Sequence, residues 1–190
     1  MAKIRLITFF NMSIFYDAFS IKFARIEIKN WEAKKKDILR KIGSLTCNNK
    51  KEAYLETNFF NDVYNKDAMD VRNILQEELY EFSQRSGLEG VEINGSWVER
   101  AHSGMNHNVH NHGALGYSAA CYVCYDPLVH TPTQFVAPFN SSIEGDLIRY
   151  EPENVKEGTL ILFPSYLHHY TKSNLSDKER VVLSFNLKCF

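Results

Sequence analysis

The sequence predicts a mainly β protein with flanking helices, built as an antiparallel jelly roll, or double-stranded β-helix, of the cupin-like kind. From Val91 onward, short runs of β-type residues are separated by turn residues at near-regular spacing. Before that point, apolar residues recur with the period of a helix. A chain of 190 residues fits one domain. We therefore expect a single domain over residues 1–190, with a helical N-terminal support at 1–90 and the jelly-roll core at 91–190.

The N-terminal part is predicted to contain an extended segment followed by two helices. Residues 1–19 have a basic start and many apolar residues, but an asparagine interrupts them and no small-x-small cleavage site follows. We therefore expect a strand or an extended segment there rather than a signal peptide. A helix is predicted from Asn30, a suitable N-cap, to Gly43. A second helix is predicted from about residue 66 to 86, with Gly87 as its stop signal.

The C-terminal part contains six runs that are typical of short strands. They are VEINGSWVERA, ALGYSAACYVCYD, TQFVAPF, DLIRYE, GTLILFPSY and ERVVLSFNLK. Because side chains of a strand alternate between its two faces, the last run divides into two sets. One face carries Arg180, Val182, Ser184 and Asn186, and the other carries Val181, Leu183 and Phe185.

Composition excludes several classes of function. The 22 basic and 23 acidic residues give a formal charge of -1, which offers no electrostatic footprint for nucleic acid. No stretch reaches the roughly 20 apolar residues of a membrane-spanning helix. The 4 cysteines are too few and too irregular for a secreted disulfide scaffold, so a reducing compartment fits. We expect a cytoplasmic protein, located in the host cytoplasm if a phage encodes it.

Histidines are the most informative residues of the chain. All 7 lie in the C-terminal half, and histidine is the commonest metal ligand in proteins. His110 and His112 are one residue apart, so on an extended segment they point to the same side and can share a metal ion. His169 follows the buried run that ends at Pro164 and can supply a third imidazole. Its neighbour His168 competes for that role, since the two cannot both point inward.

Arg180 is the second informative feature. An arginine on the inward face of a jelly roll is a buried charge that needs an anionic partner. A dicarboxylate co-substrate would supply one. Three imidazoles and open coordination positions would together form the facial site of a non-haem iron oxygenase.

The stretch from Trp97 to Asn186 resembles the 2-oxoglutarate/Fe(II)-dependent oxygenases related to prolyl hydroxylases, a family known from bacteria and marine phages. The motifs that carry this resemblance are Trp97 followed by Gly104 and HNVHNHG, the strand SAACYV, the string EGTLILFPSYLHH and the ending ERVVLSFN. The helical N-terminal part also suits that family, so the resemblance extends over most of the chain.

The resemblance implies roles for individual residues. It makes His110 the first iron ligand and His169 the distal one. It places Arg180 on the distal carboxylate of 2-oxoglutarate, a bidentate contact that suits the planar guanidinium. The same co-substrate would be contacted by Tyr122, Ser184 and Asn186.

The second iron ligand departs from the usual pattern of the family. Most such oxygenases have His-x-Asp or His-x-Glu, whereas this chain has His112 in the acidic position. Either His112 ligates and the triad is all histidine, or a carboxylate comes from Glu99, Asp126 or Asp146. We favour His112 because its spacing places it on the ligand face. With three neutral imidazoles, the metal centre would have one more net positive charge than it has with the usual triad of two histidines and a carboxylate.

The implied reaction is the hydroxylation of a substrate C–H bond, with Fe(II) as metal and 2-oxoglutarate and dioxygen as co-substrates. The resemblance suggests a peptidyl residue such as proline as substrate, although nothing in the residues selects proline. A homodimer could form edge to edge through the aromatic-rich N-terminal segment.

Two rival interpretations remain open at this point. A three-histidine cupin without 2-oxoglutarate would share the spacing of Gly158, Pro164 and His169. Such cupins have a glutamate shortly after the H-x-H, whereas the segment GALGYSAAC contains no carboxylate, and they would not require Arg180. A non-catalytic jelly-roll module, for binding or structure, would leave the histidines as metal-free surface residues.

Overall fold

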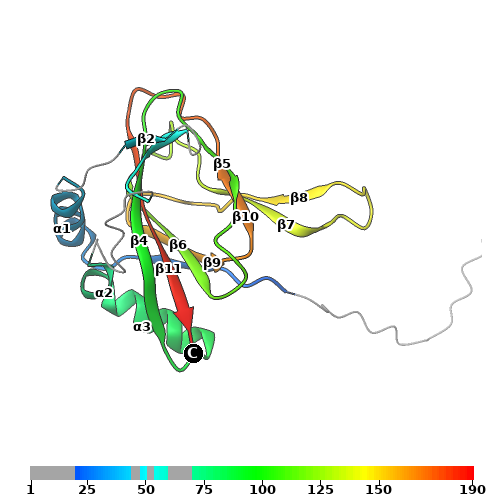
Figure 1. Cartoon of the computed structure of the whole chain (residues 1–190), viewed down its shortest axis with the longest axis horizontal. Helices are drawn as coiled ribbons and strands as arrows, with labels where there is room; N and C mark the ends of the chain where they lie inside the picture. Colours follow the sequence, from blue (N-terminus) through cyan, green and yellow to red (C-terminus); the bar gives the residue numbers. More distant parts are fainter. Residues whose placement is uncertain (1–19, 44–47, 51–53, 60–69) are drawn as a thin grey trace, which may run out of the picture.

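The structure is a computed structural model that describes residues 20–43, 48–50, 54–59 and 70–190 (Figure 1). In chain order the elements are β1 (Ala24–Glu27), α1 (Trp31–Gly43), β2 (Asn48–Lys50), β3 (Leu55–Thr57), α2 (Val71–Ile74), α3 (Gln76–Ser86), β4 (Val91–Ala101), β5 (His107–His110), β6 (Tyr117–Cys124), β7 (Gln134–Asn140), β8 (Leu147–Tyr150), β9 (Thr159–Pro164), β10 (His168–Thr171) and β11 (Arg180–Cys189).

The strands form two antiparallel sheets. The larger sheet has seven strands in the order β1-β9-β6-β11-β4-β3-β2, and the smaller has four in the order β5-β10-β7-β8. Most neighbours along the two sheets are not consecutive in sequence, for example β9 beside β6 and β6 beside β11, as is typical of a jelly roll. The predicted mainly β fold with antiparallel sheets is therefore confirmed.

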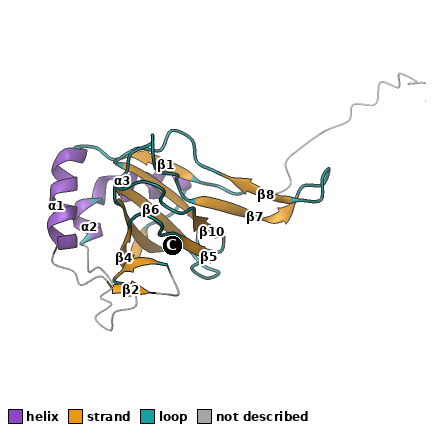
Figure 2. Ribbon diagram, turned by 90° about the horizontal axis from the view of Figure 1, so that it is seen from above, coloured by secondary structure: helices purple, strands orange, loops and turns teal. Residues whose placement is uncertain are grey.

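Helices cover the outer face of the larger sheet, and the smaller sheet packs on its inner face (Figure 2). Apolar residues of α1, α2 and α3 join the outward side chains of the sheet, including Val181, Leu183 and Phe185, in one core. A second core lies on the inner side and includes Val182 and Phe135 of the two sheets. The alternation predicted for β11 therefore decides which side chains face the helices and which face the interior.

The predicted elements agree with the structure in most places. Helix α1 covers Trp31–Gly43, and the second predicted helix is divided at Leu75 into α2 and α3. Gly87 ends α3 in the left-handed conformation, with φ 71°. The N-terminal half also contributes three short strands, β1 to β3, which helical periodicity does not predict. Residues 1–19 lie outside the described residues, as does the predicted start of the second helix at 66.

A hairpin of β7 and β8 projects from the body beside β10 (Figure 1). It exposes several apolar side chains, namely Phe139, Ile143, Leu147, Ile148 and Tyr150.

Within the described ranges, no helix is long and apolar enough to cross a membrane.

Candidate metal centre

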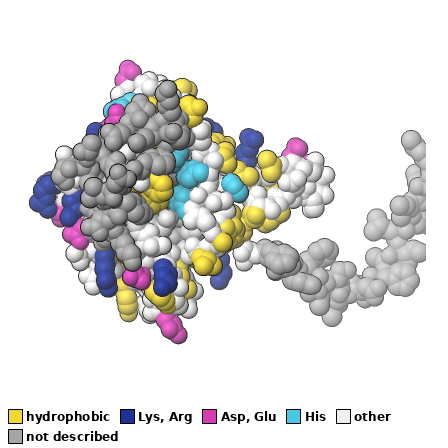
Figure 3. All heavy atoms as spheres, viewed as in Figure 1, with side chains coloured by type: hydrophobic (Ala, Val, Ile, Leu, Met, Phe, Trp, Pro, Cys, Tyr) yellow, Lys and Arg dark blue, Asp and Glu magenta, His cyan; other side chains and the backbone are white. Residues whose placement is uncertain are grey.

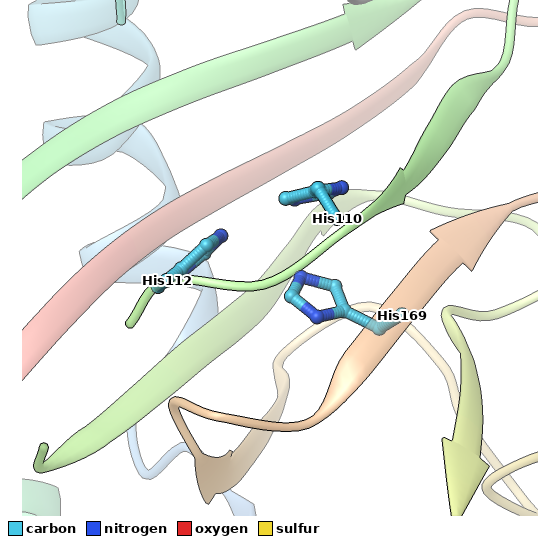
Figure 4. A group of neighbouring side chains, drawn as sticks. All are labelled: His110, His112 and His169. Carbon is cyan, nitrogen blue, oxygen red and sulfur yellow. The ribbon is translucent and has the colours of Figure 1, made fainter. Parts of the chain in front are cut away.

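His110, His112 and His169 converge on one point (Figure 4). One ring nitrogen of each lies within 4.8 Å of the others. His110 ends β5 and is directly opposite His169 of β10, which fixes two of the three by strand pairing. His112 is on the loop after β5, where its main-chain N–H donates to the main-chain oxygen of Ser165 at 2.9 Å. Figure 3 shows histidine side chains gathered on this face at the base of the projecting hairpin.

Hydrogen bonds select one tautomer for two of the imidazoles. Nδ1 of His110 lies 2.7 Å from a main-chain oxygen, and Nδ1 of His169 lies 2.9 Å from another, in each case two residues earlier in the chain. A carbonyl oxygen can only accept, so Nδ1 carries the proton in both rings. The Nε2 lone pairs of His110 and His169 are therefore the ones free to bind a metal ion.

Side chains of the larger sheet orient the third imidazole. Nδ1 of His112 lies 2.9 Å from Oδ1 of Asn186 and 2.9 Å from Oγ of Ser118. Ser118 also donates to Oδ1 of Asn186 at 2.8 Å. Such partners behind a ligating histidine fix the orientation of its ring. Asn186 was expected at the co-substrate, and its described contact is with this candidate ligand.

The cluster favours neutral imidazoles. Burial, and next the charge of His107, lower the pKa of His110 from 6.5 to about 4. Burial also lowers the pKa of His112, and it lowers that of His169 well below 6.5. Neutral imidazole is the form that binds metal, so at neutral pH no proton needs to leave. The donor set fits a divalent transition-metal ion.

Arg180 is buried, with only 3% of its surface exposed. Nη2 donates to Oγ1 of Thr171 at 2.8 Å, and Nη1 donates to the main-chain oxygen of Thr131 at 3.2 Å. Thr171 is on the strand that carries His169, so the guanidinium lies against the same small sheet as the cluster. Among the described residues, no carboxylate forms an ion pair with Arg180.

Two further residues expected at the co-substrate are on the inner side of the larger sheet. Tyr122 is buried, and its hydroxyl donates to Oγ1 of Thr133 at 3.1 Å and accepts from the Thr133 N–H at 3.0 Å. Ser184 is also buried, and its hydroxyl donates to Glu99 at 3.2 Å. Both hydroxyls therefore contact protein groups of the interior.

The three carboxylates considered as alternative ligands have different surroundings. Asp126 pairs with Lys178 at 2.5 Å, and Asp146 is exposed near the tip of the hairpin. Glu99 differs from both, because it is mostly buried on β4 beside the histidines. The group of described residues close enough to hold a metal ion nevertheless consists of the three histidines.

His107 is a neighbour of the cluster that the sequence did not reveal. Its ring stacks on that of His110, with centroids 3.9 Å apart and planes 29° apart. On a regular strand two residues three positions apart face opposite sides. Here four residues of β5 lie opposite three of β10, since His110 pairs with His169 and His107 with Thr171. This bulge turns both rings to the same side, and no spacing rule predicts it.

The fold and the cluster define a class of protein, an antiparallel jelly roll that carries a candidate metal centre of three histidines. Residues 95–186 match the family model described as "Putative 2OG-Fe(II) oxygenase". This match agrees with the family that the sequence predicted, and it covers the region from β4 to β11 that carries the three histidines and Arg180. The cofactors of this enzyme class are 2-oxoglutarate and Fe(II), and the cluster offers a donor set for the iron.

Solved structures share the fold at low sequence identity. An oxidoreductase of the 2OG-Fe(II) oxygenase family from Burkholderia pseudomallei is 12% identical, with a TM-score of 0.63 over 87% of this chain and 84% of that chain. A prolyl-4-hydroxylase from Pseudomonas putida is 15% identical, with a TM-score of 0.56 over 87% and 91%. HygX from Streptomyces hygroscopicus, solved with nickel, 2-oxoglutarate and hygromycin B, is 13% identical, with a TM-score of 0.59 over 87% and 82%. No curated protein matches the chain in sequence.

Proposed function

We propose that this protein is a 2-oxoglutarate- and Fe(II)-dependent hydroxylase whose metal is held by His110, His112 and His169. The observation that carries the proposal is the buried Arg180, which lies beside the strand of His169 and forms no ion pair with a carboxylate of the described residues. A buried guanidinium without a carboxylate is costly unless an anion enters. The distal carboxylate of 2-oxoglutarate is that anion.

The side chains divide the work of this reaction. Iron with 2-oxoglutarate and dioxygen supplies the oxidant that hydroxylates a C–H bond, while the co-substrate is converted to succinate and carbon dioxide. The three imidazoles would hold the metal ion, and a set of three protein ligands would leave coordination positions for 2-oxoglutarate and dioxygen. Arg180 orients the co-substrate, and the hydroxyl of Tyr122 lines the same interior. The apolar inner core around Phe135 and Phe163 excludes water from this side of the site.

We further propose a peptide or protein side chain as the substrate. The exposed apolar hairpin of β7 and β8 is continuous with β10, the strand of His169, and offers a surface for an extended chain. The similar Pseudomonas enzyme is a prolyl-4-hydroxylase, whereas HygX was solved with a small molecule, so proline is one candidate residue. The homodimer expected through residues 1–19 stays a proposal, because that segment lies outside the described residues.

Replacing Arg180 tests the proposal. Arg180→Ala should weaken 2-oxoglutarate binding by roughly 100-fold or more, because the carboxylate would lose a buried charged partner. Iron binding should change by less than about threefold, since the imidazoles keep their own hydrogen bonds. Calorimetric titration under anaerobic conditions measures both affinities.

Arg100→Ala is a matched control. Arg100 is a half-buried arginine on β4, the strand next to β11, and its side chain forms an ion pair with Glu179. It should leave both affinities unchanged. If Arg180→Ala binds 2-oxoglutarate as the wild type does, the proposed co-substrate site is wrong. If the wild type binds iron but no 2-oxoglutarate, a three-histidine cupin reaction replaces the proposal, and failure to bind metal at all favours a structural module.

A further inference from the structure

Glu99 is a mostly buried carboxylate that the proposed reaction does not use. Its side chain is 11% exposed and lies on β4. We propose that Glu99 is a positioning residue for the metal centre: it holds two aromatic rings against two of the candidate ligands and supplies, from outside the coordination shell, the negative charge that an acidic ligand would have brought. This inference rests on the proposed function.

Three side chains donate hydrogen bonds to this carboxylate. Oε1 accepts from Nε1 of Trp97 at 2.9 Å and from Oγ of Ser184 at 3.2 Å, and Oε2 lies 3.3 Å from Nδ1 of His107. Burial alone would raise the pKa of Glu99, but the charge of His107 and the hydrogen bonds from His107 and Trp97 hold that pKa well below its ordinary range. A carboxylate with several donors is fixed in place and stays ionised.

Two of these donors are themselves packed against candidate ligands. The His107 ring stacks on His110 at 3.9 Å between centroids, and the indole of Trp97 packs edge-on against His112 at 5.1 Å and 67°. One carboxylate therefore restrains two rings, and each ring limits the rotation of one ligand. Groups that orient metal ligands in this way typically change metal affinity by about 10–100-fold when they are removed.

The charge of Glu99 adds to this geometric effect. Three neutral imidazoles leave the full double charge of a ferrous ion uncompensated, whereas a His-x-Asp site neutralises half of it. Glu99 is near enough to favour the charged form of His110, His112 and His169, although burial dominates their lowered pKa values. A negative charge at this place attracts the metal ion without occupying a coordination position.

The same charge acts in the opposite sense on the anionic co-substrate. Glu99 also raises the pKa of Arg180 against the larger effect of burial, which places the carboxylate within electrostatic range of the guanidinium. Removal of the Glu99 charge should therefore weaken metal binding, whereas the affinity for 2-oxoglutarate should stay the same or increase. A residue that only supported the fold would weaken both.

The test is Glu99→Gln, which keeps the size and some hydrogen bonds but removes the charge. Calorimetric titration with Mn²⁺ should show a metal affinity reduced by about 10–100-fold. At saturating Mn²⁺, the affinity for 2-oxoglutarate should be unchanged or increased. Glu78→Gln is the matched control, because Glu78 is a buried glutamate that pairs with Lys34 at 2.8 Å on the helical side. It should lower thermal stability and leave the Mn²⁺ affinity unchanged.

A second variant separates the effect of geometry from the effect of charge. Trp97→Phe keeps a ring against His112 but loses the N–H bond to Glu99, and its Mn²⁺ affinity should fall less than that of Glu99→Gln. An Mn²⁺ affinity of Glu99→Gln within twofold of the wild type overturns the inference. A loss beyond about 1000-fold with an altered visible spectrum of the Co²⁺ protein also overturns it, because Glu99 would then be a ligand. Since Mn²⁺ affinity is measured without co-substrate, failure of the proposed function would be seen separately as absent 2-oxoglutarate binding.

Discussion

At the residue scale, His112 occupies the position where most related oxygenases have an acid, and its surroundings suit an imidazole. Its ring is held at Nδ1 by Asn186 and Ser118 and lies edge-on to Trp97. An aspartate would be shorter and would meet the oxygen of Asn186 unless that amide turned over. These contacts favour the proposal that His112 is a ligand and that the centre consists of three histidines.

This arrangement predicts how substitutions at His112 change the affinity for Fe(II). His112→Ala should reduce Fe(II) affinity by about 100-fold, because one of three ligands is lost. His112→Asp should lose less than about 10-fold, since a carboxylate is itself an iron ligand. Anaerobic titration with Fe(II) measures both.

The exposed neighbour His168 provides the control for histidine removal. Its Nε2 lies 3.2 Å from Nδ2 of Asn111 and it is not part of the cluster. His168→Ala should bind iron as the wild type does. Normal iron binding by His112→Ala would show that the second ligand is elsewhere.

The candidate site could be predicted only in part at this scale. His110, His112, His169 and Arg180 could be named because period-two alternation and a buried charge are visible in the sequence. His107 could not, because a bulge in β5 reverses the side to which it points. The contacts of Asn186 and Ser184 depend on tertiary packing, so the spacing of residues in the sequence could not predict their hydrogen-bond partners.

At the element scale, the start of β6 is held by a close approach of two strands. Gly116 has φ 82°, and a Cβ there would lie 2.1 Å from the main-chain oxygen of Leu187 on β11. Its own oxygen accepts from the N–H of Ser165, which follows β9. Only glycine permits this contact, so Gly116 keeps β6, β9 and β11 in register near His112.

Gly116→Ala should lower the free energy of unfolding by about 2–4 kcal/mol, because both a steric overlap and a left-handed backbone must be accommodated. Gly104→Ala is a suitable comparison, since Gly104 has the same φ of 82° with no atom within 4 Å of the added Cβ. It should lose only about 1–2 kcal/mol. Urea denaturation measures both, and equal losses would show that the close approach has no energetic effect.

Most elements of the fold are predictable from the sequence, and the exceptions have a common cause. The six longer runs alternate apolar and polar residues or are wholly apolar, and each contains a strand of the structure. Strands β5 and β10 have the sequences HNVH and HHYT, which carry no such pattern. They are strands because they pair with each other and because β10 also pairs with β7, and no short stretch of sequence contains that information.

At the scale of the whole molecule, the candidate metal centre lies between the two sheets. His110 and His169 belong to the smaller sheet, while Asn186 and Arg180 belong to β11 of the larger one. A metal ion that binds only the folded state stabilises it in proportion to its concentration over its dissociation constant. Metal binding should therefore strengthen the contact between the sheets.

The metal-free protein should lose stability on mild acidification. The pKa of His110 is lowered to about 4, mainly by burial, while an unfolded histidine titrates near 6.5. Between these values the unfolded chain binds more protons, so stability falls as the pH drops from 6.5 toward 4. His112 and His169 act in the same direction.

Urea midpoints at pH 7.5 and pH 5 in the presence of a chelator measure this effect. The midpoint should be lower at pH 5, and His110→Asn should show a smaller decrease than the wild type. An equal or higher midpoint at pH 5 would contradict neutral buried imidazoles in the folded state.

The central claim is that three histidines hold an iron ion to which 2-oxoglutarate binds. It is tested most directly by anaerobic titration of 2-oxoglutarate into the Fe(II)-loaded protein, with the visible spectrum recorded at each addition. A weak charge-transfer band that grows to saturation, and that is missing in Arg180→Ala, is the predicted result. Iron-loaded protein that shows no such band at saturating 2-oxoglutarate would contradict the account.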